Sequence, residues 1–351
     1  MLLKKFLKKT NFTSFDRSIS ITTMHQKPDR FRILEDMQKI SQIPRGAGLS
    51  YVPASFGKNI LVKDMLFFNR VLQFDESSKI VIVEAGIRLT KLLEWSFDKH
   101  LFFPVLPGWP EITVGGCLAA NVHGKNPFKD GTFMDHVEWI ELFNPTFGTK
   151  IISRTNERKV FEATCGGLGL TGIITKVALR LQELHSDSLL ITPKKVETFT
   201  DALKIIKENS NSDVLYSWHM GSTFLNFGKG IVRLGTFSKN FGLDPFFIPE
   251  IKHMSSDNHL PPFSLWNNFS SSIINSINRK IEISKGQIRK TLFSGLFPFI
   301  DKANIFYSLY GSKGFNEYQI LIDNNHANEF LDDLVKLIKS ENPPLTFLFM
   351  K

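Results

Sequence analysis

The chain has 351 residues, with 42% hydrophobic residues, 22% charged residues and a formal net charge of +9. This length and composition predict about two globular domains and exclude intrinsic disorder, while the positive charge favours anionic partners such as phosphates, a nucleotide cofactor or an anionic lipid surface. The charge is scattered, and the sequence has neither zinc-finger spacing nor a basic helix with base-reading side chains, so we predict no nucleic-acid partner.

The N-terminus is basic and amphipathic. Met1–Thr10 alternates leucine and phenylalanine with four lysines, but it is too short to span a bilayer. We predict a basic tail over residues 1–20. A solvated tail is one interpretation, and a weak contact with a membrane surface is the other.

Short β-branched runs separated by glycine turns follow, and they predict an α+β domain over residues 21–184. A helix is expected at Thr90–Lys99, and a short helix is expected to end at Phe161–Thr164. The predicted strands are Leu61–Val62, Ile80–Glu84, Val137–Phe143 and Ile173–Leu181.

A second α+β domain with an antiparallel sheet is predicted over residues 185–351. Helices are expected at Lys195–Asn209 and Asn325–Ser340, and Asn240–Arg289 is expected to be loop with short helices. The predicted strands are Val214–Met220 paired with Gly230–Thr236, then Phe315–Ile322, and a buried strand at Leu345–Met350. Because the sequence stops one residue after this strand, we expect the domain to be truncated at its C-terminus.

Two cysteines, Cys117 and Cys165, lie beside glycine pairs in apolar surroundings. They are interpreted as reduced, buried residues of a cytoplasmic protein. Two cysteines alone cannot build a metal site, so none is predicted.

Three glycine-containing motifs carry the chemistry. The first, IPRGAGLSY at Ile43–Tyr51, can turn sharply and present backbone N–H groups to a pyrophosphate, although in isolation a plain glycine turn is the better explanation. The second, LPGWPEITVGGCLAANVHGKN at Leu106–Asn126, has small residues that let a flat ring or a phosphate approach the backbone. It also places His123 and Lys125 beside that loop.

The third motif, GGLGLTGII at Gly166–Ile174, formally matches the dinucleotide fingerprint G-x-G-x-x-G. That fingerprint requires a preceding strand and a following helix, whereas here a helical segment precedes and a strand follows. We therefore reject a Rossmann NAD site. A glycine loop that enters a strand can still offer backbone groups to an adenine.

In this order, RGAGLSY, TVGG-CLAANVHGKN and ATCGGLGLTGII resemble the PCMH-type FAD-binding domain of the vanillyl-alcohol oxidase superfamily, and in particular its sugar and aldonolactone oxidases. The likeness is strong over about residues 40–184 and patchy beyond them. It implies a two-subdomain FAD-binding fold followed by a substrate domain.

Position by position, the resemblance implies roles for individual residues. The cofactor-binding positions are Arg45, Gly46, Ala47, Gly48, Leu49, Ser50, Tyr51, Gly108, Thr113, Val114, Gly115, Gly116, Ala120, His123, Gly172 and Ile174. His123 and Lys125 are the implied catalytic residues, and the implied substrate residues are Trp218, Tyr318, Gln319 and Lys351. Many superfamily members attach FAD through a histidine where this sequence has Leu49, so the flavin is expected to be non-covalent.

The implied reaction is hydride transfer from a sugar carbinol to flavin N5, with His123 as a candidate base and Lys125 as an electrostatic clamp. A phosphorylated or lipid-phosphate-linked sugar suits the basic charge, and a neutral aldonolactone or polyol is the other substrate class that the sequence allows. The alternatives are an aldonolactone oxidase that uses oxygen, a non-catalytic or partner-dependent FAD-binding protein, and a carbohydrate-binding module without flavin.

Overall fold

A computed structural model of the chain describes residues 7–28, 41–238, 261–300 and 303–351. The chain forms two compact units. The first unit comprises residues 1–124 and 130–184, and the second comprises residues 125–129 and 185–351.

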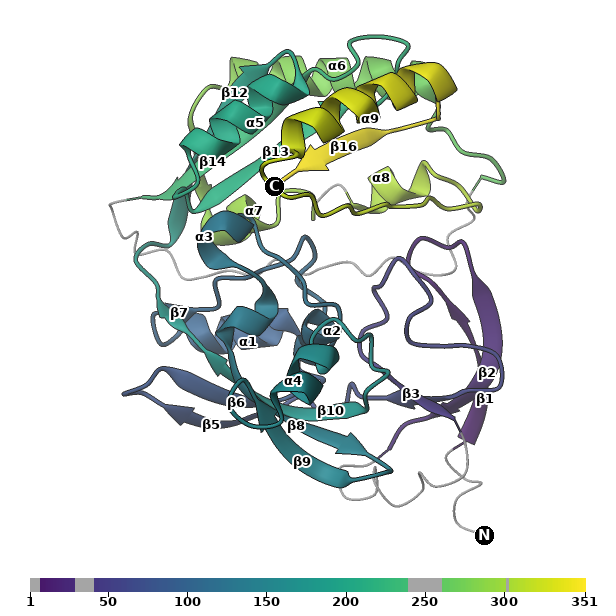
Figure 1. Cartoon of the computed structure of the whole chain (residues 1–351), viewed down its shortest axis with the longest axis vertical. Coiled ribbons are helices and arrows are strands. Elements are labelled where there is room, and N and C mark those ends of the chain that lie inside the picture. The colour runs from purple at the N-terminus through teal and green to yellow at the C-terminus, as the bar shows by residue number, and fades with distance from the viewer. Residues whose placement is uncertain (1–6, 29–40, 239–260, 301–302) are drawn as a thin grey trace. The chain divides into compact units, whose positions relative to one another are not determined.

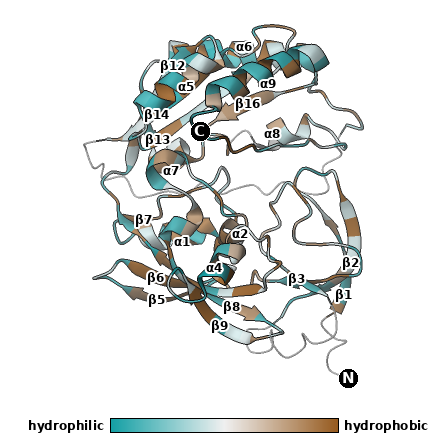
Figure 2. Cartoon of the chain, viewed as in Figure 1, coloured by the Kyte–Doolittle hydropathy of each residue, from teal (hydrophilic) through white to brown (hydrophobic). Residues whose placement is uncertain are grey.

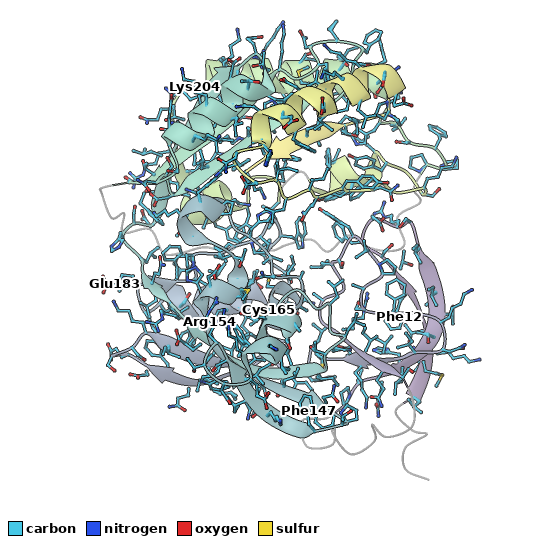
Figure 3. All side chains as sticks on the ribbon, in the orientation of Figure 1. Phe12, Phe147, Arg154, Cys165, Glu183 and Lys204 are labelled. Carbon is cyan, nitrogen blue, oxygen red and sulfur yellow. The ribbon has the colours of Figure 1, made fainter. Side chains whose placement is uncertain are left out.

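The first unit begins with a four-stranded sheet of order β1-β2-β4-β3. Its strands are β1 (Leu7–Thr13), β2 (Ser20–Gln26), β3 (Gln42–Arg45) and β4 (Leu61–Asp64). β1 and β2 are antiparallel, while β4 is parallel to both of its neighbours. Phe12, Ile43, Phe56 and Val62 form its apolar core, and Figure 3 labels Phe12 on β1. Residues 7–13 are therefore a strand, and the expectation of a tail over residues 1–20 is wrong for them.

An antiparallel five-stranded sheet of order β5-β6-β10-β8-β9 forms the rest of the first unit. Its strands are β5 (Val71–Asp75), β6 (Ile80–Glu84), β8 (Val137–Asn144), β9 (Gly148–Ser153) and β10 (Ile173–Arg180). β7 (Leu101–Phe102) and β11 (Gln182–Glu183) form a separate pair. The helices are α1 (Leu89–Phe97), α2 (Val114–Ala119), α3 (Pro127–Asp130), a 3₁₀ helix (Phe133–His136) and α4 (Arg158–Thr164). The strands predicted from β-branched runs are confirmed here.

The second unit is built on an antiparallel sheet of order β15-β12-β14-β13-β16. Its strands are β12 (Ser188–Val196), β13 (Val214–Met220), β14 (Gly230–Phe237), β15 (Ile288–Thr291) and β16 (Phe347–Met350). The helices are α5 (Phe199–Glu208), α6 (Asn268–Ser284), α7 (Leu292–Leu296), α8 (Ala303–Ser308) and α9 (Ala327–Glu341).

Helices cover both faces of this sheet (Figure 1). Leu215 and Val232 pack under α5, whereas Trp218 and Ile231 pack against Ile283 of α6. Adjacent residues of a strand point to opposite faces, so α5 and α6 lie on opposite sides. Figure 2 shows hydrophobic and hydrophilic residues alternating along α5 and α9, as expected for helices with one face against a sheet.

Four predictions for the second unit need correction. The helix predicted at Lys195–Asn209 starts only at Phe199, because β12 runs through Val196 and the capping box of Thr198 and Asp201 fixes the helix start. Within Asn240–Arg289, the described residues include the long helix α6 rather than short ones, and residues 240–260 lie outside the described part. Phe315–Ile322 has no regular structure. Leu345–Met350 yields the edge strand β16, which is partly exposed rather than buried.

Helices and antiparallel sheets that alternate in this way confirm the predicted α+β class. Among the described helices, none is both long and apolar enough to cross a membrane.

Candidate functional site

The first glycine motif leaves β3 and turns immediately against the second motif. At Gly46, an added Cβ would lie 2.1 Å from Oγ1 of Thr113, so no larger residue fits without displacing that side chain. Gly48 has a φ of +72°, a left-handed conformation that glycine adopts without steric cost. These two glycines are therefore required for the shape of the loop, as the motif predicted.

Arg45, the residue before this turn, is directed into the small sheet. Its guanidinium carbon lies 4.8 Å from the ring centroid of Phe12 and 5.6 Å from that of Phe56, and Nη1 donates to Ser55 Oγ at 2.7 Å. Burial lowers the pKa of the guanidinium, although the nearby Asp64 opposes this effect. The guanidinium of Arg45 also packs directly against the loop, because a Cβ added at Gly48 would lie 2.1 Å from its Nη2. Arg45 therefore supports the loop from the side of the small sheet.

The loop itself offers hydrogen-bond donors. Within the described residues, the backbone N–H groups of Gly46, Ala47, Gly48 and Leu49 have no acceptor. The carbonyl of Ser50 is already used, because it accepts the N–H of Phe15 at 3.1 Å. Consecutive N–H groups in a tight turn are a common way to bind phosphate oxygens.

The second motif is different, because the backbone N–H groups at the start of α2 already donate to acceptors of the protein. Oγ1 of Thr113 caps α2 by accepting the N–H of Gly116 at 3.2 Å. The N–H groups of Val114 and Gly115 donate to carbonyls of residues 87 and 85 at 2.9 and 2.7 Å. At Gly115, an added Cβ would lie 3.0 Å from the carbonyl oxygen of Ala85. This segment therefore supplies a close-packed wall rather than free anion donors.

The third motif contacts both of the others. The N–H groups of Gly166 and Leu168 donate to the carbonyls of Leu118 and Ala119, at 3.0 and 2.9 Å, and so bind the C-terminal end of α2. A Cβ at Gly169 would approach Pro44, in the first motif, to 3.0 Å. Each of the three motifs thus touches the other two, although they are far apart in the sequence.

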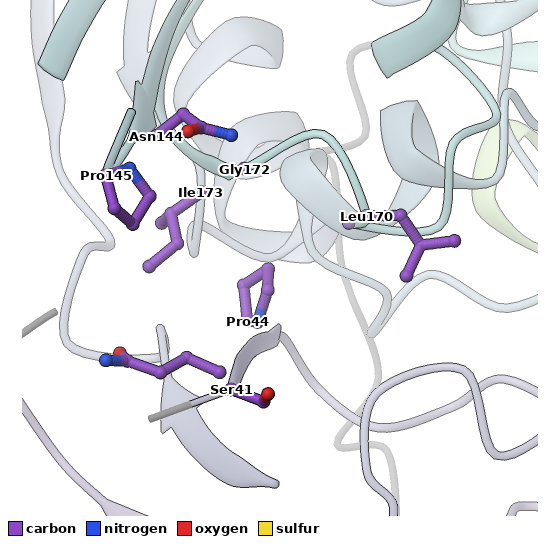
Figure 4. Close-up of a pocket in the computed structure, with 9 residues that line it drawn as sticks. Ser41, Pro44, Asn144, Pro145, Leu170, Gly172 and Ile173 are labelled. Atoms are coloured by element: carbon purple, nitrogen blue, oxygen red, sulfur yellow. The ribbon is translucent and has the colours of Figure 1, made fainter. Parts of the chain in front are cut away.

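A pocket of about 210 Å³ lies where the first and third motifs meet (Figure 4). It is lined by Ser41, Gln42, Pro44, Asn144, Pro145, Gly169, Leu170, Gly172 and Ile173. Gly172 has a φ of +147°, and a Cβ there would meet the carbonyl oxygen of Phe143 at 2.4 Å. Ile174 is buried beside it in β10. A strand rather than a helix follows the glycines, so the rejection of a Rossmann site is confirmed.

The other candidate cofactor positions of the second motif are more open. Gly108 and Ala120 are exposed, and no atom lies within 4 Å of a Cβ added at Gly108. His123 is half-buried, and its Nδ1 lies 3.2 Å from the carbonyl oxygen of Gly124. This contact favours a proton on Nδ1, which leaves Nε2 as the basic nitrogen of a neutral imidazole. In the first motif, the ring centroid of Tyr51 lies 5.4 Å from that of Phe15, with the two rings tilted by 40°.

Lys125 belongs to the second unit. Its carbonyl accepts the N–H of Leu215 at 3.1 Å, and the adjacent Asn126 donates its amide to the carbonyls of Ser210 and Ser212 at 2.7 and 2.6 Å. Asn126 is fully buried, so it anchors this segment beside β13. The segment in turn fixes the position of Lys125.

The ammonium of Lys125 lies in unusual surroundings. The residue is 8% exposed, and its Nζ lies 6.0 Å from the ring centroid of Phe297. Burial first, and then the charges of Lys351 and Arg233, lower its pKa to about 7. The described residues give it no ion-pair partner. A buried cation beside two others is suited to an anionic ligand.

The four predicted substrate residues are only partly brought together. Trp218 is buried on β13, and its Nε1 has no hydrogen-bond partner among the described residues. Lys351 follows β16, the neighbouring strand; although the residue as a whole is exposed, burial of its amine lowers the pKa to about 8. Tyr318 and Gln319 are exposed in an irregular segment, where Gln319 donates to Glu317 at 2.9 Å. The carboxylate of Glu317 acts electrostatically on Lys351, which links this segment to the cluster.

Sequence reasoning missed the residues that complete this cluster. Arg233 on β14 lies opposite Tyr216 on β13, donates to its hydroxyl at 2.7 Å and forms a two-pronged ion pair with Glu282 of α6. The only sequence signal was an arginine inside an otherwise apolar strand, and such a residue usually needs a buried partner.

Comparison with known proteins agrees with this geometry. A family model described as an FAD binding domain matches residues 33–149, which include the first two motifs. The chain is 26% identical to decaprenylphosphoryl-β-D-ribose oxidase of Mycolicibacterium smegmatis over 85% of the chain and 66% of that protein. It is 28% identical to probable L-gulonolactone oxidase 4 of Arabidopsis thaliana over 41% of the chain and 26% of that protein. A D-lactate dehydrogenase of Anaerostipes hadrus is 27% identical over 41% of the chain and 31% of its own length.

The chain therefore spans between about a quarter and two thirds of these relatives. The matched family model and the names of the relatives agree with the resemblance found in the motifs. Residues 33–149 match an FAD binding domain, and the chain is similar in sequence to proteins named as a sugar oxidase, gulonolactone oxidases and a lactate dehydrogenase.

Proposed function

We propose that this chain is an FAD-dependent oxidoreductase that binds FAD non-covalently and oxidises a CH–OH group of a sugar. The convergence of the three glycine motifs is the observation that carries the proposal. Contacts between Gly46 and Thr113, between Gly169 and Pro44, and between Leu168 and Ala119 build one continuous surface of backbone and small residues.

The two ends of the cofactor would be held by different parts of that surface. The N–H groups of Gly46–Leu49 would bind the pyrophosphate, since the donors of α2 are already used. The pocket beside Gly172 suits the adenine, because its lining is largely apolar and Ser41 and Gln42 add polar side chains, whereas the amide of Asn144 is already hydrogen-bonded to Thr171 and Thr146. When bound, the flavin supplies a hydride acceptor.

Leu49 supports non-covalent binding. It occupies the position at which the resemblance places an attaching histidine, and a hydrocarbon side chain has no nucleophile to bond to the flavin. The flavin should therefore pass through a membrane filter after acid denaturation of the purified protein. Colour retained with the precipitate would contradict non-covalent attachment.

The cationic cluster supports an anionic substrate. Lys125, Arg233 and Lys351 bring three basic groups together, balanced by Glu282 and Glu317, and the buried Nε1 of Trp218 has no hydrogen-bond partner among the described residues. A sugar phosphate, either free or linked to a lipid, would place its negative charge beside Lys125. His123 is the candidate base for the sugar hydroxyl, through Nε2.

Anaerobic mixing with sugars tests the proposal. We expect a phosphorylated pentose to bleach the oxidised flavin band, and the same pentose without phosphate to do so with a much higher KM. In the Lys125→Gln variant, the preference for the phosphorylated sugar should be lost. Bound flavin that no sugar reduces would favour a non-catalytic FAD-binding protein, and peroxide released with an aldonolactone would favour an aldonolactone oxidase.

A further inference from the structure

Helix α6 has its polarity reversed. Its buried residues are Ser271, Ser272 and Asn275, all of them polar. Five of its outward residues are apolar, and we call them the α6 stripe: Phe269, Ile273, Ile274, Ile277 and Ile281. Their exposed fractions run from 36% for Ile274 to 58% for Phe269. A helix on the surface of a globular protein ordinarily shows the opposite pattern.

Hydrogen bonds to the sheet fix this orientation. Asn275 donates to the carbonyl of Thr346 at 2.9 Å, and Arg279 donates to the carbonyls of Gly230 and Val196 at 3.0 and 2.7 Å. Rotating the helix to bury its isoleucines would break these bonds and leave buried backbone acceptors unsatisfied. The α6 stripe is therefore a stable feature of the surface.

Phe224, in the connection between β13 and β14, extends the stripe. It is 57% exposed, and its ring lies 5.4 Å from that of Phe269 in an edge-to-face contact. Apolar side chains that continue across two segments of the surface are typical of a binding surface rather than of isolated exposed residues.

The surroundings of the stripe are basic. Residues 261–300 contain five lysines and arginines and one acidic residue, Glu282, which is paired with Arg233. Glu197, which lies outside this range, is paired with Arg279 of α6. Lys280 and Lys285 are exposed and have no ion pair with any described residue. An apolar helix face flanked by unpaired cations is the pattern of helices that lie in the interface of an anionic membrane.

We propose that α6 docks this protein on an anionic phospholipid surface, with the α6 stripe inserted among the lipid headgroups and Lys280 and Lys285 against lipid phosphates. The helix does not cross the bilayer. It lies in the plane of the interface, as its 17 residues and its polar inward face require.

A second copy of the chain fits this surface less well. A 17-residue helix offers a stripe roughly 25 Å long and 10 Å wide, or about 250 Å², whereas a stable interface buries about 800 Å² on each partner. The acidic residues beside the stripe, Glu282 and Glu197, are already paired with Arg233 and Arg279, so they are not free to pair with Lys280 of another copy. Both the area and the charge therefore favour a lipid surface.

Co-sedimentation with vesicles tests the proposal, using the full chain loaded with FAD. The vesicles are phosphatidylcholine alone, or phosphatidylcholine with phosphatidylglycerol. We expect binding to the anionic vesicles only, weakened by salt. The Ile273→Ser/Ile277→Ser variant should lose about tenfold in lipid partitioning, because two half-exposed isoleucines no longer enter the interface. Lys280→Gln/Lys285→Gln should bind less and lose salt sensitivity.

The matched control is Ile151→Ser. Ile151 lies on β9 in the first unit and is 44% exposed, compared with 52% for Ile277, so the control removes a similar apolar surface elsewhere. It should bind anionic vesicles like the wild type. Unchanged binding by the isoleucine pair variant would overturn the proposal, and would assign any lipid binding to another segment such as the lysine-rich N-terminus. A dimer in light scattering that this variant dissociates would also overturn it, in favour of self-association.

Discussion

Lys125 should make the protein less stable, and replacing it with methionine should reveal by how much. Burial and neighbouring cations lower its pKa from 10.5 to about 7. That difference corresponds to an upper limit of ~5 kcal/mol for holding the ammonium in the folded state, at about 1.4 kcal/mol per pKa unit. Since neighbouring residues relax around a buried charge, we expect Lys125→Met to gain about 2 kcal/mol, or roughly 4–8 °C in Tm.

The sign of the pH dependence follows from the direction of the pKa change. Below a pH of about 7, the lysine is charged in both the folded and the unfolded states, so the whole cost of burial is present. Between this pH and 10.5, the folded protein has released the proton while the unfolded chain still holds it. The wild type therefore gains stability as the pH rises through this window, and the advantage of the methionine variant should shrink.

Thermal unfolding followed by circular dichroism measures this difference at about pH 6 and about pH 9. Lys129→Met is the control, because Lys129 lies in the same segment but is exposed and paired with Asp213. It should be no more stable than the wild type. The reasoning would be refuted by a methionine variant at position 125 that gains nothing in acid, or whose gain does not change with pH. The same variant should bind anionic substrates poorly, which would explain why the costly lysine is present.

Other predictions concern both units. Gly46→Ala should lose at least about tenfold in FAD affinity, measured by fluorescence titration, because its Cβ would meet Thr113 at 2.1 Å. Asn126→Ala should lower the free energy of unfolding by about 2–4 kcal/mol in urea titrations, since two partly buried carbonyls lose their donors. Cys117 and Cys165 should resist iodoacetamide until the protein is denatured. Burial raises the pKa of both thiols, that of Cys165 to about 12, so little reactive thiolate is present. Rapid labelling of the native protein would contradict this prediction.

The sequence predicted elements well where local pattern and environment agree. Ile80–Glu84 and Val214–Met220 are β-branched or apolar runs in central strands, and both formed as expected. Helix α6 could not be recognised as one long element, because its serines and asparagines face inward and its isoleucines face outward. β1 was missed because its lysines and threonines are largely exposed on a sheet edge.

The candidate site was predictable as a set of motifs but not as a geometry. Nothing in the spacing of Gly46 and Thr113 indicates that they touch, since the sheets between them set that distance. The sequence also does not show which of the glycine motifs has backbone N–H groups available for a ligand. Only the hydrogen-bond pattern distinguishes the first loop, whose N–H groups are available, from Gly115 and Gly116, whose N–H groups are used.

The short segment Lys125–Lys129 has a consequence for how this architecture can evolve. Because the chain passes from the first unit to the second after Gly124, returns after Lys129 and leaves again after Leu184, the second unit is not encoded by one continuous stretch. A recombination event that exchanged only residues 185–351 would not include Asn126. The hydrogen bonds from Asn126 to the carbonyls of Ser210 and Ser212 would then have to form with a new partner. An exchange that keeps these hydrogen bonds must therefore carry residues 125–129 together with residues 185–351.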